Sequence, residues 1–170
     1  MEDKIWTTFL HMLPIFTESQ RFSQIWLWAI LVGTMFIPVL GLYQQMVVGV
    51  PFGNNPMPNA GLVAMLLFEV VFLYFFWSIR LDTDIDQQEI RFAFRPFSRR
   101  SILWSDVKTA QVVNYGFVGG WGVRYSASYG KIYNVNGKYG LALELKSGEK
   151  ICIGTQKQEQ LKEVLSKLTR

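Results

Sequence analysis

The sequence predicts an α+β membrane protein: a hairpin of two transmembrane helices, then a small antiparallel β-barrel of about seven strands with a C-terminal amphipathic helix. Three observations lead to this fold class. Two apolar runs, residues 25–45 and 61–79, each match the roughly 20 residues that a helix needs to cross a bilayer. After residue 80, charged residues are frequent and apolar residues alternate with polar ones. The chain then ends in a segment with helical periodicity.

The two apolar runs are expected to form a membrane hairpin over residues 25–80. Between Arg21 and Arg80 the sequence contains no Lys, Arg or Asp and a single Glu, a gap that a soluble chain of average charge would not leave. Trp and Tyr residues near the ends of the runs favour the membrane–water interface. The alternative is a pair of buried core helices in a soluble domain, which would need a large partner layer that the rest of the chain does not supply.

The charges that flank the hairpin predict its orientation. Residues 46–60 connect the two spans without any charge and are rich in Pro, Gly and Asn, as in a turn. Arg21 precedes the first span and Arg80 follows the second, so the positive-inside rule places the connection outside and both termini in the cytoplasm. Residues 1–24 are expected to form an N-terminal interfacial segment, and residues 81–170 a separate cytoplasmic domain.

The cytoplasmic domain is predicted to consist mainly of short strands. Its 90 residues can bury one modest core, and it carries 14 Lys and Arg against 9 Asp and Glu. This basic balance suits a surface that faces anionic lipid. Nucleic acid is not an expected partner, because the basic residues form no patterned stripe or recognition motif. Period-two alternation and β-branched residues predict strands in residues 81–86, 89–95, 101–104 and 107–115, two short strands in residues 124–135, and a hairpin in residues 141–154.

A helix is expected to close the chain. Thr155 is its predicted N-cap, and Gln158 stands three residues later, as in a capping box. Four apolar residues then follow at helical spacing and predict one buried stripe: Leu161, Val164, Leu165 and Leu168.

The reactive side chains predict a protein that is not an enzyme and binds no cofactor or metal. His11 is the single histidine and has no paired ligand, and the single cysteine, Cys152, cannot form an intramolecular disulfide or build a metal cluster. Asp82, Asp84 and Asp86 alternate along one strand face and could bind Ca²⁺, but the glycine and final glutamate of an EF-hand loop are missing. A solvated strand face is the other interpretation.

Glu69 lies in the middle of the second span, 11 residues or roughly 16 Å of helix before Arg80. Because a charge at this depth costs several kcal/mol, we expect the carboxyl group to be protonated and to face protein. Thr34 lies at a similar depth in the first span and is the expected hydrogen-bond partner, with Glu69 of a second copy as the alternative. The pair could hold helices together, or Glu69 could be the working acid of a small oligomeric transport or channel-like subunit.

Two segments of the soluble domain could contact lipid headgroups or a partner protein. In RPFSRR, the three arginines Arg95, Arg99 and Arg100 fall in one predicted loop. Each basic side chain near an anionic bilayer is worth about 1 kcal/mol, although a solvated loop is the simpler interpretation. In the glycine-rich segment, Phe117 and Trp121 could project as apolar tips toward the bilayer or a partner, or belong to a bulged strand.

Four segments of the soluble domain share a recurrent pattern of strands and a final helix: ILWSDVKTAQV (102–112), GGWGVRYS (119–126), YNVNGKYGLALELKSGEK (133–150) and IGTQKQEQLKEVL (153–165). They resemble the bacterial pleckstrin-homology-like (PH-like) domains, which often follow one or two membrane spans. The segment FTESQRFSQIWLW (16–28) is similar to uncharacterised bacterial membrane proteins of this layout. The resemblance implies a PH-like fold in a multi-pass protein of the bacterial inner membrane, and no enzymatic activity.

Together, these observations predict a membrane-anchored interaction or scaffold module at the cytoplasmic face of the membrane. Its expected partners are the lipid bilayer and either a second copy of the chain or another membrane protein. The transport or channel-like subunit that uses Glu69 is the alternative function.

Overall fold

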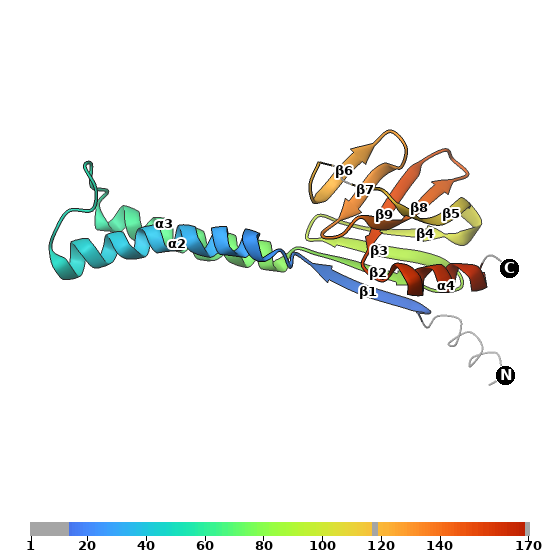
Figure 1. Ribbon diagram of the computed structural model, residues 1–170, viewed down its shortest axis with the longest axis horizontal. Helices are drawn as coiled ribbons and strands as arrows, with labels where there is room; N and C mark the ends of the chain where they lie inside the picture. The colour runs from blue at the N-terminus through green and yellow to red at the C-terminus, as the bar shows by residue number, and fades with distance from the viewer. Residues whose placement is uncertain (1–13, 117–118, 169–170) are drawn as a thin grey trace. The chain divides into compact units, whose positions relative to one another are not determined.

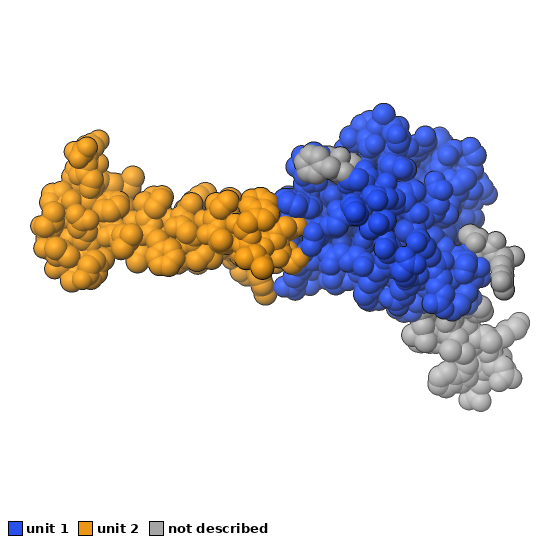
Figure 2. All heavy atoms as spheres, in the orientation of Figure 1, with its two compact units in different colours: residues 1–22, 79–170 blue, residues 23–78 orange. Residues whose placement is uncertain are grey.

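A computed structural model describes residues 14–116 and 119–168 of the chain (Figure 1). The chain forms two compact units, coloured separately in Figure 2. The smaller unit comprises residues 23–78, and the larger combines the chain before residue 23 with the chain after residue 78. The α+β class expected from the sequence is confirmed, because the smaller unit is helical and the larger contains two sheets and a helix.

The smaller unit is a hairpin of two apolar helices, α2 (Ile25–Tyr43) and α3 (Asn59–Ser78), and α2 continues into one π-helical turn, η1 (Gln44–Val48). Both helices are long and apolar enough to cross a membrane, in agreement with the two expected spans. The helices approach closely at Gly41, where an added Cβ atom would lie 3.0 Å from the Leu62 side chain. A larger residue at this crossing would require the Leu62 side chain to shift.

Four antiparallel strands form the first sheet in the order β1-β2-β3-β4. They are β1 (Phe16–Arg21), β2 (Arg80–Ile85), β3 (Glu89–Arg95) and β4 (Ser98–Leu103). Strand β1 comes before the first span and β2 after the second, yet they pair from Phe16 opposite Ile85 to Arg21 opposite Arg80. The two spans are thus inserted between neighbouring strands. The expected interfacial segment, residues 1–24, has to be corrected for residues 16–21, which belong to the sheet.

Five strands form the second sheet in the order β5-β8-β9-β7-β6, in which only β7 and β9 are parallel. They are β5 (Val107–Asn114), β6 (Gly122–Ser126), β7 (Gly130–Asn134), β8 (Tyr139–Leu145) and β9 (Lys150–Thr155). A short 3₁₀ turn, η2 (Trp104–Asp106), leads from the first sheet to the second. This turn follows the β3–β4 ladder. The Trp104 backbone N–H donates to the carbonyl oxygen of Gln88, and the Trp104 indole N–H donates to the carbonyl oxygen of Asp86.

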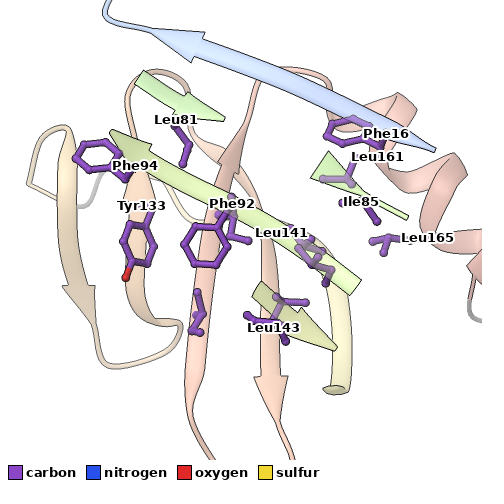
Figure 3. Packing of buried hydrophobic residues seen from close by; sticks show 14 of the residues in the cluster. Phe16, Leu81, Ile85, Phe92, Phe94, Tyr133, Leu141, Leu143, Leu161 and Leu165 are labelled. Atoms are coloured by element: carbon purple, nitrogen blue, oxygen red, sulfur yellow. The ribbon is translucent and has the colours of Figure 1, made fainter. Parts of the chain in front are cut away.

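The closed barrel of about seven strands is not found. Among the described residues, the nine strands form two sheets and no ladder joins one sheet to the other. Both sheets instead turn one face toward a common core (Figure 3). Figure 3 shows side chains of β1, β2 and β3, of the second sheet and of the C-terminal helix meeting there.

The C-terminal helix α4 (Gln158–Leu168) covers part of this core with the predicted apolar stripe, since Leu161, Val164 and Leu165 are buried. Phe16 of β1 is only 1% exposed, so the strand before the spans belongs to the core as fully as the strands after them. Burying an aliphatic or aromatic side chain of this size stabilises a fold by about 1.5–3 kcal/mol.

Hydrogen bonds also attach β1 to the beginning of α4. The buried carboxylate of Glu18 accepts from the Thr155 hydroxyl at 2.6 Å and from the Gln156 backbone N–H at 2.8 Å. A carboxylate at a helix N-terminus satisfies N–H groups that lack helical partners and interacts favourably with the helix dipole. Thr155 accepts from the Lys157 N–H at 3.0 Å, as a cap does. The expected capping box is wrong, because the buried Oε1 atom of Gln158 has no hydrogen-bond partner among the residues that the structure describes.

Candidate functional site

The carboxyl group of Glu69 lies beside Thr34 on the other helix of the hairpin. The Thr34 hydroxyl is 3.4 Å from Glu69 Oε2 and 2.9 Å from the carbonyl oxygen of Leu31, so its single proton is shared between two acceptors. Both Glu69 and Thr34 are half-buried. Because 3.4 Å is at the long end of hydrogen-bond distances, Thr34 uses only a small part of the carboxyl group's bonding capacity.

The helix surface next to this pair is open. An added Cβ atom at Gly33 would meet no heavy atom within 4 Å, whereas Gly41 is tightly packed against the second helix. Ala29, one turn before Gly33, is also exposed. Gly33 therefore has no packing function inside this hairpin. Small residues on such a face allow another helix to approach closely.

The basic segment predicted as one loop is divided between two strands. Strand β3 ends at Arg95 and β4 begins at Ser98, so Arg99 and Arg100 lie on β4, where successive side chains point to opposite faces. The Nε atom of Arg95 is 2.9 Å from Asp82. The three arginines therefore do not form one cluster.

Arg100 forms a two-pronged ion pair with Glu149, which lies in the turn between β8 and β9. The two terminal nitrogens of Arg100 are 2.6 and 2.5 Å from the two carboxylate oxygens of Glu149. This hydrogen bonding raises the pKa of Arg100 and lowers the pKa of Glu149. Arg100 thus connects the first sheet to the second.

Four arginines, here called the arginine cluster, gather instead at one end of the outward face of the first sheet: Arg21, Arg80, Arg95 and Arg99. The first three lie side by side on one rung, because Arg21 pairs with Arg80 and Arg80 pairs with Arg95. The next outward rung contains Asp82 and Arg99. Asp82 contacts the Nε atoms of Arg80 at 3.2 Å and Arg95 at 2.9 Å. Arg21 and Arg80 were missed as site residues because they become neighbours only through strand pairing.

A hollow of about 270 Å³ opens on this face beside the arginine cluster. It forms over Ala93, whose small side chain lies between the longer ones of Asp82 and Arg99 in the strand register. The residues that line it are Asp82, Asp84, Arg91, Phe92, Ala93, Arg95 and Arg99.

The alternating aspartates take part in hydrogen bonds of the sheet. The hydroxyl of Thr17 donates to Asp84 at 2.5 Å, and that of Ser19 donates to Asp82 at 2.6 Å. Asp86 is not on their exposed face: it is buried at the β2–β3 turn and accepts two backbone N–H groups. Among residues 14–116 and 119–168, no three His, Cys, Asp or Glu side chains come together as a metal site would require.

Of the two expected apolar tips, Phe117 lies outside the described residues. Trp121 is half-buried and lines a cavity of about 690 Å³ beside the beginning of α4. Asn134 is 1% exposed at the same cavity, and its Oδ1 atom has no hydrogen-bond partner. Trp121 is thus part of a cavity wall.

Cys152 is completely buried on β9, as a member of the smaller apolar cluster of the second sheet. Burial raises the pKa of its thiol to about 12. Because the thiolate is the reactive species, this cysteine is not a nucleophile in the folded protein.

Comparisons with known proteins do not add a relative: no protein-family model matches the chain, and no curated protein matches it either.

Proposed function

We propose that the chain is a membrane-anchored, non-catalytic interaction module with a PH-like domain at the cytoplasmic face of the bacterial inner membrane. One observation carries this proposal: the hairpin is inserted between the paired strands β1 and β2. Because Arg21 and Arg80 are opposite each other in one ladder, the chain leaves and re-enters the sheet at the same end. Both ends of the hairpin would then lie on one side of the membrane, as expected for two helices that each cross it once.

The remaining features of the two units support this assignment. The 49–58 connection has no charge, while arginines flank the hairpin at its other end, as the positive-inside rule expects for a cytoplasmic domain. Two sheets that share one core with a C-terminal helix support the PH-like assignment. Such a domain presents the edge strands of two sheets, which suits binding rather than transport.

Replacing residues 23–78 with an Asn-Gly turn tests the anchoring. Phe22 and Ile79 would then continue the β1–β2 ladder into a two-residue hairpin, for which Asn-Gly is a favoured turn. We expect the shortened chain to be soluble and folded, and the full chain to stay in the membrane after alkaline extraction. A chain that starts at residue 79 is the control: it lacks Phe16 and Glu18 and should not fold. Release of the full chain from the membrane during alkaline extraction would contradict the proposal.

The orientation can be tested with single cysteines, because Cys152 does not react in the folded protein. In intact cells we expect a membrane-impermeant maleimide to label Asn55→Cys, in the connection between the spans. Tyr125→Cys, at a side chain that is 82% exposed on β6, should be labelled only after the cells are opened. The opposite pattern would place the domain outside.

A specific observation favours assembly through the hairpin. Glu69 has a single long hydrogen bond, and the open face at Gly33 and Ala29 is next to it. A second copy would present the same carboxyl group, and two protonated carboxyl groups can each donate and accept. The transport or channel-like subunit is the second candidate, because several hairpins would be needed to enclose a path lined by Glu69.

A further inference from the structure

We infer that the arginine cluster and Phe97 form a clamp for the phosphate of an anionic lipid headgroup. The inference rests on the proposed membrane anchoring and names the ligand of the domain's membrane-proximal end. It replaces the loop of Arg95, Arg99 and Arg100 with a site to which β1, β2, β3 and β4 each contribute one arginine.

The covalent chain places this site at the membrane surface. Arg21 precedes the beginning of α2 at Ile25 by four residues, and Arg80 follows the end of α3 at Ser78 by two. An extended chain covers at most about 3.6 Å per residue, so these backbones lie within about 14 and 7 Å of the span ends. This limit holds for every orientation of the domain relative to the hairpin.

Strand register brings further positive charge to the same end of the sheet. Arg95 is opposite Arg80, and Arg99 lies on the next outward rung. These two rungs contain four guanidinium groups and one carboxylate, that of Asp82. Like charges opposite each other on neighbouring strands destabilise a sheet. A bound phosphate would offset this repulsion, and guanidinium groups match phosphate geometry with two parallel hydrogen bonds.

Phe97 extends beyond the last rung in the turn between β3 and β4. Its side chain is 58% exposed, and its ring stacks on that of Phe94 with 5.6 Å between centroids. Since Arg95 at the end of β3 pairs with Arg80, this turn is at the end of the sheet where the spans attach. An aromatic ring held there can enter the membrane interface, which aromatic side chains favour.

The hollow over Ala93 provides room for the phosphate. Three arginines, Arg91, Arg95 and Arg99, line it beside the carboxylates of Asp82 and Asp84, and the hollow is open at the surface of the sheet. Arg100 is excluded from the site because it lies on the inward-facing row of β4 and is bound to Glu149. A headgroup, rather than a soluble anion, is the fitting ligand, because the covalent link keeps the arginine cluster at the bilayer surface.

The experiment uses the full chain in nanodiscs that contain equal amounts of phosphatidylglycerol and phosphatidylcholine. Native mass spectrometry counts the lipids that stay bound after release from the disc. We expect the wild type to retain phosphatidylglycerol selectively, and the double variant Arg95→Gln/Arg99→Gln to lose this selectivity by about fivefold for each arginine. The matched control is Arg124→Gln/Lys146→Gln, which removes the same charge from exposed positions of the second sheet and should keep the selectivity. Unchanged selectivity in the arginine-cluster variant, or an equal loss in the control, would overturn the clamp.

A fluorescent label tests the aromatic part. Because Cys152 is unreactive, Phe97→Cys can be labelled alone with an environment-sensitive dye, with Tyr125→Cys as the comparison. We expect a blue-shifted, lipid-quenchable signal at position 97 in discs with phosphatidylglycerol and a water-like signal at position 125. Water-like signals at both positions would rule out insertion of the turn.

Failure of the clamp can be distinguished from failure of the proposed function. If all variants incorporate into the discs but retain no lipid selectively, the clamp is wrong and the anchored module is unaffected. If the wild-type chain does not incorporate into the discs, the anchoring itself is wrong, and the clamp that rests on it is also rejected.

Discussion

Two glutamates, one in each unit of the molecule, are hydrogen-bonded in very different ways. Glu18 in the larger unit is 4% exposed and accepts two short hydrogen bonds, from Thr155 at 2.6 Å and from Gln156 at 2.8 Å. Glu69 in the hairpin has, among the described residues, one bond of 3.4 Å, from a Thr34 hydroxyl that also contacts the carbonyl oxygen of Leu31.

The difference separates a structural acid from an acid that can bind something else. Buried polar groups in proteins are nearly always paired, so a fully bonded carboxylate such as Glu18 is a part of its own fold. The Glu69 carboxyl group has one long bond and retains unused capacity, and unsatisfied polar groups are costly in the membrane that the hairpin is proposed to cross. The same residue type therefore holds β1 to α4 in one unit and favours a further partner in the other.

Glu18→Leu should have the largest effect. It removes the acceptor of two bonds, from the buried Thr155 hydroxyl and from the Gln156 N–H. Since hydrogen bonds to charged groups contribute about 1.5–3 kcal/mol each, we expect a loss of about 3 kcal/mol in the unfolding free energy. Urea unfolding of the detergent-solubilised full chain, followed by near-ultraviolet circular dichroism, measures it.

The matched control for this change is Glu159→Leu, at a glutamate on α4 whose side chain is 75% exposed. It should change stability by no more than about 0.5 kcal/mol. Equal losses for the two variants would show that Glu18 is not the link between β1 and α4.

Substitutions of Glu69 should have an intermediate effect, on assembly rather than on folding. Interhelical hydrogen bonds in membranes contribute about 0.6–2 kcal/mol, so Glu69→Leu should weaken self-association by roughly three- to thirtyfold. Glu69→Gln keeps a donor and an acceptor and should preserve assembly. The mass of the protein in detergent or nanodiscs, for wild type and both variants side by side, measures this.

If the Glu69→Leu variant loses a defined oligomer that the Glu69→Gln variant preserves, Glu69 is a contact between chains. If all three masses agree, Glu69 does not hold chains together. Proton flux into liposomes for wild type and Glu69→Gln would then decide whether it is a working acid of a transport subunit.

A third glutamate, Glu149, should show the smallest effect. It is fully engaged with Arg100, but both side chains are more than a third exposed, and such pairs contribute about 0–1 kcal/mol. Because the pKa of Glu149 is lowered in the folded state, its stabilisation is present at neutral pH and disappears as the pH falls through that lowered pKa.

Glu149→Gln should therefore lower the stability by about 0.5 kcal/mol at pH 7 and by less at pH 3. Thermal unfolding at the two pH values measures the difference. A loss that is as large at pH 3 as at pH 7 would mean that packing of the turn, and not the ion pair, is responsible.

Local patterns in the sequence were sufficient for most of the secondary structure, but not for β1, which was expected to be part of an interfacial segment. The two spans follow from apolar length and from the absence of charge between Arg21 and Arg80, and α4 follows from its stripe of buried leucines and valine. Most strands of the soluble domain could be located from period-two alternation. The proximity of Thr34 to Glu69 also follows locally, because two antiparallel helices of fixed rise bring equal depths together.

The strand partners could not be predicted in this way. Alternation shows which residues share a face, but it does not say that residues 16–21 pair with a strand that follows both spans, or that β4 and β5 belong to different sheets. Strand pairing depends on the register between distant segments and on the shared core, and a single strand contains neither. Only the tertiary structure therefore aligned Arg21 with Arg80 and Arg95, paired Arg100 with Glu149, and brought Glu18 to the start of α4.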